Sequence, residues 1–135
     1  MPPKRLSPDD PREWLNRARS NLTRAKTHNP EIYLEDLCFD AQQAAEKAIK
    51  AVLLKAAISF PYIHDLATLL SLLEKAEVAI PQPVREAGRL TRFAVATRYP
   101  GITEPVTEEE YRASVSIAAT VVAWAEQHLK GEADT

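Results

Sequence analysis

The chain has 135 residues, 45% of them hydrophobic and 27% charged, with one cysteine and a formal net charge of −2. These values suit one domain with its own core and exclude a disulfide framework, and the charge gives no general attraction for a polyanion. The N-terminus lacks a secretory h-region and no apolar run is long enough to cross a bilayer, so we expect a cytoplasmic protein without membrane contact.

Hydrophobic residues recur at helical spacing, and no segment alternates like a strand. The first helix is expected to begin at Asp10-Pro11 with Glu13 completing a capping box, and to stop before Asn29-Pro30. The second runs from about Glu31 to Ile58. Its predicted buried stripe is Cys38, Ala41, Ala45, Ala48, Val52 and Ala56, and its predicted solvated face is Glu35, Asp36, Gln43, Glu46, Lys47 and Lys50. A Glu46–Lys50 pair is expected on that face.

Three further helices follow. His64-Asp65 is predicted to cap a helix from Leu66 to about Val78, which holds more leucine than one face needs and so offers some to a partner. A fourth helix is expected from Pro81 to about Thr97, and a fifth from Thr107, with Glu110 closing a capping box. The fold class is therefore all-α: an up-and-down antiparallel bundle of four main helices plus a shorter extra helix, in a single domain of residues 1–135 with its core at about 11–129 and flexible tails at 1–9 and 130–135.

The segment from Arg92 to Tyr99 is the main candidate for chemistry. Two arginines and a tyrosine at a helix end can hold a phosphate and stack on a base, and they can equally be a solvated charge and a helix terminus. His64 is most simply a helix cap or a half-buried polar residue. No metal site and no cofactor are predicted, since no histidine has a partner at ligand spacing.

Three motifs in this order resemble the HEPN domain family: the run from Cys38 to Lys55, then His64-Asp65-Leu66, then Thr97-Arg98-Tyr99-Pro100. The resemblance extends from about Trp14 to Leu129. It implies a homodimer that partners a minimal nucleotidyltransferase in a toxin–antitoxin-like pair, in which the HEPN subunit supplies part of a nucleotide or substrate site or is itself modified. Tyr99 would be the acceptor in that case.

The segment from Arg92 to Tyr99 also resembles the catalytic motif of the HEPN ribonucleases, but it differs from that motif at one residue. Their motif is an arginine, four to six residues and a histidine, often followed two positions later by a tyrosine. Arg92 and Tyr99 match, whereas Thr97 stands in the place of histidine and cannot move a proton near neutral pH. Arg98, one position along, is effectively never deprotonated.

The sequence thus favours a binding module that is not itself catalytic. The predicted ligand-binding residues are Arg92, Thr97, Arg98, Tyr99 and Lys47, with a nucleotide or RNA as the ligand. Two alternatives stay open. One is a metal-independent endoribonuclease that uses Arg92, Arg98 and His64, and the other is a purely structural or interaction bundle.

Overall fold

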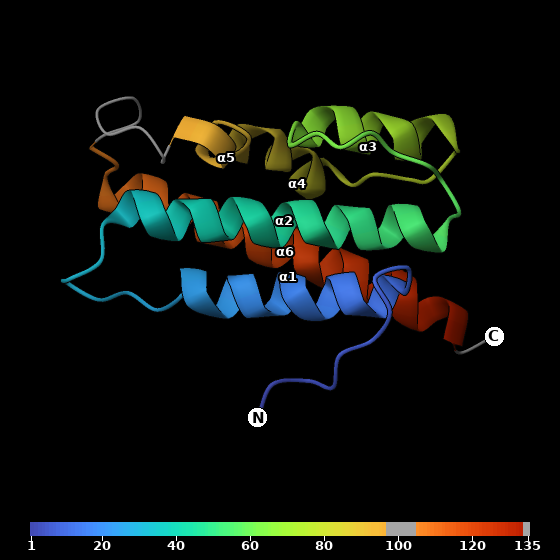
Figure 1. The fold of residues 1–135 in the computed structure, drawn as a ribbon. Coiled ribbons are helices and arrows are strands. Elements are labelled where there is room, and N and C mark those ends of the chain that lie inside the picture. The colour runs from blue at the N-terminus through green and yellow to red at the C-terminus, as the bar shows by residue number, and fades with distance from the viewer. Residues whose placement is uncertain (97–104, 134–135) are drawn as a thin grey trace.

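The computed structural model describes residues 1–96 and 105–133, and all regular structure in that part is helical (Figure 1). The all-α prediction is confirmed. None of the described helices combines the length and apolarity that a membrane span requires. In chain order the helices are α1 Pro11–Ala25, α2 Leu34–Lys55, α3 Leu66–Lys75, α4 Gln82–Arg85, the 3-10 helix η1 Glu86–Leu90, α5 Phe93–Ala96 and α6 Glu108–Ala133.

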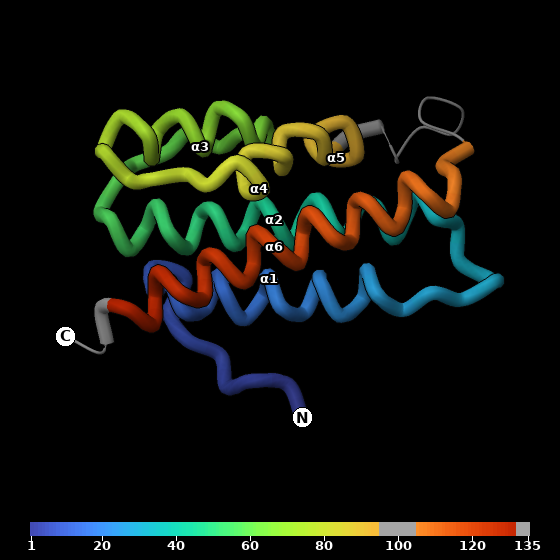
Figure 2. Tube along the Cα trace, turned by 180° about the vertical axis from the view of Figure 1, so that it is seen from behind, coloured from blue at the N-terminus to red at the C-terminus, as the bar shows by residue number. Residues whose placement is uncertain are grey.

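Helix α2 is the centre of the bundle and packs against α1, α3, η1, α5 and α6. α1 runs antiparallel to α2, the α4–η1–α5 segment runs back along the bundle, and α6 returns in the direction of α2 (Figures 1 and 2). The connector of residues 56–65 returns to the middle of α2, so that α3 lies beside the second half of α2. α3 is therefore the extra helix of the predicted bundle; with ten residues it is shorter than α1, α2 and α6 but longer than α4 or η1.

The core is built on the small side chains of α2. Cys38, Ala41, Ala45, Ala48 and Val52 are buried, as the sequence predicts, and small side chains at helical spacing let neighbouring helices approach closely. The prediction is wrong for Ala56, which is exposed because α2 ends at Lys55. The leucines of α3 are used mainly in the core of one chain, which leaves only Leu72 for the partner that the sequence suggested. One chain already buries four of them and partly buries the fifth; the four are Leu66, Leu69, Leu70 and Leu73, and the fifth is Leu72.

The N-terminal caps of α1 and α6 differ. Asp10 caps α1 by accepting a hydrogen bond from the backbone N–H of Arg12 (2.9 Å), but Glu13 does not close the predicted box and instead accepts from the backbone N–H of Leu6 (2.9 Å). At α6 the predicted box is complete. Glu110 donates its backbone N–H to Thr107 Oγ1 (3.0 Å), and its carboxylate accepts from the N–H of Thr107 (3.2 Å).

The prediction of one continuous fourth helix is wrong in the described residues. The segment is divided into α4, η1 and α5, and Thr91 lies in the turn between η1 and α5. Thr91 Oγ1 accepts a hydrogen bond from the backbone N–H of Leu66 (3.1 Å), one of the N–H groups that the start of α3 leaves without an intrahelical partner. The break therefore provides a hydrogen-bond acceptor for the start of α3. It also places Arg92 in the turn immediately before α5.

Helix α2 ends in a left-handed residue. Ala57 has φ 58°, and the backbone N–H of Ile58 reaches the carbonyl of Leu53 (2.9 Å) as in a Schellman motif. A residue with a Cβ pays roughly 1–2 kcal/mol in this conformation, whereas glycine does not. Glycine also loses more backbone entropy on folding, which offsets part of this gain. We therefore expect Ala57→Gly to raise the free energy of unfolding by about 0.5–1 kcal/mol, as measured by urea titration.

The matched control is Ala76→Gly. Ala76 ends α3 with φ −92°, where glycine relieves no strain, so no stabilisation is expected there. An equal change in both variants would contradict this account of Ala57.

Candidate functional site

A pocket of about 370 Å³ lies between η1, the start of α5 and the first turns of α6. It contains the first residue of the predicted binding segment and a second arginine from η1. Its lining residues are Arg89, Leu90, Arg92, Phe93, Glu110, Ala113, Ser114 and Ile117. We call it the Arg92 pocket.

Two neighbours fix the guanidinium of Arg92. Its Nη2 donates to Glu110 Oε2 at 2.8 Å, and its Cζ lies 4.5 Å from the ring centroid of Phe93, which is a cation–π distance. Phe93 is itself buried, and Thr107 also holds the Glu110 carboxylate. The side chain of Arg92 is half exposed. Arg92 is thus positioned at the edge of the pocket, where an incoming anion can still reach it.

Two ion pairs set the electrostatics of the pocket. The hydrogen bond from Arg92, followed by those from the backbone and side chain of Thr107, lowers the pKa of Glu110, so this carboxylate is ionised at neutral pH. The lining also carries Arg89, whose guanidinium lies 3.3 Å from Glu86, so each of the two arginines is paired with one carboxylate and keeps further N–H donors. Guanidinium groups bind phosphate through paired hydrogen bonds.

The pocket lining offers no activated nucleophile among the described residues. Ser114 Oγ donates to the backbone carbonyl of Glu110 (2.9 Å), which is helix back-bonding. Behind it Cys38 is fully buried, and burial raises the pKa of its thiol to about 11, although Ser114 and Arg92 act in the opposite direction. Cys38 is therefore a neutral core residue, as the sequence predicted.

Three of the predicted ligand-binding residues, Thr97, Arg98 and Tyr99, lie outside the described residues. Of the ligand-binding residues predicted in that segment, the structure therefore describes only Arg92. Two other predicted site residues are described, and neither lines the Arg92 pocket. Lys47 is nine residues after Cys38 on α2, about two and a half helical turns, and so projects from the opposite side of that helix. Its Nζ donates to Asn21 Oδ1 of α1 at 2.8 Å.

His64 does not cap α3. Asp65 does so, by accepting from the backbone N–H of Ala67 (3.2 Å), and the prediction that His64 shares this role is wrong. Nδ1 of His64 instead lies 2.8 Å from Glu46 Oε1 on α2. His64 is thus held against α2 and does not line the Arg92 pocket.

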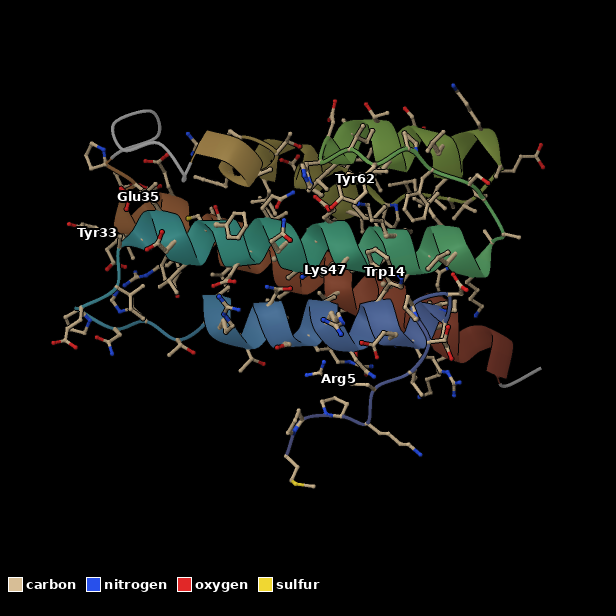
Figure 3. All side chains as sticks on the ribbon, in the orientation of Figure 1. Arg5, Trp14, Tyr33, Glu35, Lys47 and Tyr62 are labelled. Atoms are coloured by element: carbon tan, nitrogen blue, oxygen red, sulfur yellow. The ribbon has the colours of Figure 1, made fainter. Side chains whose placement is uncertain are left out.

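The sequence missed a buried polar cluster on α2. Glu46 and Lys50 form the predicted pair at 3.0 Å, but they are 4% and 3% exposed, so the prediction of a solvated face is wrong for them. Gln42 and His64 also hydrogen-bond Glu46. Three rings lie within 5.5–5.8 Å of Lys50 Nζ: those of Trp14, Phe60 and Tyr62. Figure 3 shows Trp14 and Tyr62 on either side of the middle of α2.

One signal in the sequence could have revealed this cluster. The connector after α2 carries Phe60 and Tyr62, two large rings able to cover a helix face, whereas the alanines in the middle of α2 lie on the other side of the helix. Among the described residues, no group of three histidine, cysteine or carboxylate side chains is placed to hold a metal ion.

Comparison with known proteins identifies the family. The sequence model of the HEPN domain matches residues 11–128, which is most of the chain. The chain belongs to the HEPN domain family. No curated protein sequence matches it, whereas solved structures do. The crystal structure of TT1696 from Thermus thermophilus is similar, with 30% identity and a TM-score of 0.75 over 87% of this chain and 97% of that one.

A second HEPN structure, ST0689, described as an archaeal HEPN homologue, has 25% identity and a TM-score of 0.71 over 87% of this chain and 95% of its own. Both similarities cover nearly the whole length of each partner. The HEPN bundle therefore accounts for the described fold from α1 to α6.

Proposed function

We propose that this HEPN protein is a binding module whose Arg92 pocket takes a phosphate group of a nucleotide or RNA, and that it is not itself a ribonuclease. The observation that carries the proposal is the fixed guanidinium of Arg92, held by Glu110 and Phe93 at the edge of a pocket with a second arginine. A guanidinium positioned in advance loses less entropy when it binds a phosphate.

The lining also suits the rest of a nucleotide. The pocket has an apolar side formed by Leu90, Ala113 and Ile117, and it has cationic groups from Arg89 and Arg92. Small-molecule sites combine an apolar wall with a few polar groups that fix orientation. A ribose or base against the apolar side and a phosphate at the arginines is the arrangement that we infer. Thr97, Arg98 and Tyr99 follow Arg92 in the chain and are proposed to complete the site.

The proposal excludes catalysis because a proton-transfer group is missing. Histidine performs that step in the ribonuclease motif that this segment resembles, and Thr97 replaces it here. Among the described lining residues there is no histidine either. Arginine, which stays protonated, can bind a phosphate but cannot serve as the base.

A homodimer and a minimal nucleotidyltransferase complete the proposal. The chain as a whole has a net charge of −2, so a strong phosphate site needs basic residues brought together locally. Two copies that face each other across their Arg92 pockets would double the number of arginines. In a toxin–antitoxin-like pair, the nucleotidyltransferase would then transfer a nucleotide group, and the HEPN dimer would bind the substrate or be modified. Such a pair would act in the cytoplasm.

Calorimetric titration of the full chain with ATP and with a short single-stranded RNA tests this function. Arg92→Ala is expected to weaken binding about 10- to 100-fold, since a hydrogen bond to a charged group contributes about 1.5–3 kcal/mol. The matched control is Arg85→Ala. Arg85 is a half-exposed arginine paired with Glu74 (2.7 Å) that does not line the pocket, so its loss should change affinity less than twofold.

The same samples are assayed for RNA cleavage and their mass is measured by sedimentation. No binding by the unaltered chain, or equal losses in both variants, would contradict the binding role. Cleavage that disappears in Arg92→Ala would favour an endoribonuclease instead, and a monomer at micromolar concentration would remove the dimer from the proposal.

A further inference from the structure

A second pocket, of about 290 Å³, lies between α1, α2 and the segment that precedes α1. We call it the Trp14 pocket. The two pockets share no lining residue. Lys47, which lines the Trp14 pocket, projects from the side of α2 opposite to Cys38, which lies behind the Arg92 pocket. Its lining residues are Leu6, Pro8, Glu13, Trp14, Arg17 and Lys47.

The wall formed by residues 6–8 is attached to α1 at two points. Trp14 Nε1 donates to the backbone carbonyl of Pro8 at 2.7 Å, and the backbone N–H of Leu6 donates to Glu13 Oε1 at 2.9 Å. Glu13 is buried, so the second of these bonds is shielded from water. The wall of the pocket is thus built from specific contacts.

Two cations line the Trp14 pocket and keep unused donors. Nε of Arg17 donates to Glu13 Oε2 (2.6 Å), which leaves both terminal amino groups without a recorded partner among the described residues. Nζ of Lys47 donates to Asn21 and has two further protons. Both oxygens of Glu13 are already occupied, by Leu6 and Arg17. The pocket can therefore offer charged donors to a ligand, and its one carboxylate is already neutralised.

The charge around Lys47 also favours an anion. Burial lowers the pKa of Lys47; Glu46 opposes this effect, the nearby Arg17 and Arg24 add to it, and Asp40 opposes it. A bound anion would raise this pKa again by supplying a counter-charge in place of the hydration that burial removes. Lys47 is therefore under-neutralised in a place where a small ligand can enter.

The rest of the lining is apolar and includes a flat ring. Trp14 is partly buried, with Lys50 Nζ 5.8 Å from the centroid of its ring, and Leu6 and Pro8 form the facing wall. Figure 3 shows Trp14 and Lys47 close together where α1 meets α2. Aromatic side chains bind planar groups by stacking, and the indole ring is the strongest such surface.

We propose that the Trp14 pocket binds a small molecule that combines a planar ring with a phosphate group. The ring lies against Trp14 between the walls of Leu6 and Pro8, and the phosphate accepts hydrogen bonds from Lys47 and Arg17. This site is separate from the proposed function of the Arg92 pocket and does not depend on it.

Phenyl phosphate is the probe, and phenol and inorganic phosphate are its two halves. The full chain is labelled with ¹⁵N in its tryptophans, so that Trp14 and Trp124 give one indole N–H signal each. Phenyl phosphate is expected to shift the Trp14 signal in a saturable way and to leave Trp124 unchanged. Each half should bind at least tenfold more weakly, because it makes only one of the two kinds of contact.

The variants Lys47→Gln and Arg17→Gln are each expected to weaken phenyl phosphate at least fivefold, and Lys47→Arg should restore most of the affinity. Circular dichroism and the unchanged Trp124 signal verify the fold. Arg92→Ala should leave this titration unaltered, which separates the result from the proposed function. Three results would overturn the proposal: no saturable shift at millimolar phenyl phosphate, equal binding by inorganic phosphate alone, or an unchanged affinity in both glutamine variants.

Discussion

Replacing Glu46 with leucine is expected to lower the free energy of unfolding by about 3–5 kcal/mol, because the substitution leaves a buried ammonium without its counter-charge. Lys50 is 3% exposed and its Nζ lies 3.0 Å from Glu46 Oε2. The rings around Lys50 stabilise a cation but cannot replace a full negative charge. Urea unfolding followed by circular dichroism measures the loss.

Two further variants make this prediction specific. Glu126→Leu breaks an exposed pair with Arg19 (2.8 Å) and should cost less than about 1 kcal/mol. The double variant Glu46→Leu/Lys50→Met removes both charges and should recover most of the lost stability, as replacement of a whole buried pair by apolar residues often does. If the double variant is as unstable as Glu46→Leu alone, the unpaired lysine is not the cause.

The same pair predicts how stability responds to acid. Burial disfavours the charged form of Glu46, but the hydrogen bonds from Gln42, Lys50 and His64 together outweigh burial and lower its pKa from 4.5. A carboxylate with a depressed pKa in the folded state stabilises the fold above its unfolded pKa, and that contribution is lost as the pH falls through the folded value. As the pH is lowered from about 5, the free energy of unfolding of Glu46→Leu/Lys50→Met should therefore fall less than that of the unaltered chain.

Phe93→Ala is the second substitution with a large expected effect. Phe93 is 1% exposed and among the largest fully buried side chains, so its truncation should cost about 3–5 kcal/mol. Phe93→Leu retains most of the volume and should cost about 1–2 kcal/mol. Thermal unfolding distinguishes the two.

The leucine variant also separates stability from binding. It removes the ring that lies 4.5 Å from the Arg92 guanidinium while the protein stays folded, and a cation–π contact at an exposed site contributes about 0.5–1 kcal/mol. ATP affinity in Phe93→Leu should therefore fall by about two- to fivefold. Unchanged affinity in the folded leucine variant would mean that Phe93 supports the core and does not position Arg92.

Local chemistry accounts for what the sequence could predict. Asp10 and Thr107 mark helix starts because a cap needs only a side chain and the next two or three backbone N–H groups. The stripe from Cys38 to Val52 follows directly from helical spacing. These features depend on residues within a few positions of one another, so they can be read from one sequence.

The errors come from contacts between distant segments. The pattern around Pro81–Thr97 is helical in period, but the bond between Thr91 and Leu66 of another helix favours a break there. Glu46 and Lys50 have the spacing of an exposed pair, but the return of the 56–65 connector over α2, together with Trp14 of α1, covers them. For the candidate site, the sequence identified Arg92 but not its partner Glu110, eighteen residues away.

The hydrogen bond between Leu66 and Thr91 joins the start of α3 to the turn before α5, beside the place where α3 and η1 pack against each other. Leu66 is two residues after His64, which contacts the buried Glu46, and Thr91 immediately precedes Arg92. A displacement of the 56–65 connector would therefore reach the turn before α5 by a short path. The path runs along the chain from His64 to Leu66, through the hydrogen bond from the Leu66 N–H to Thr91 Oγ1, and along the chain to Arg92. The connector that covers Lys50 and the turn that precedes Arg92 are thus tied together by a hydrogen bond at the start of α3.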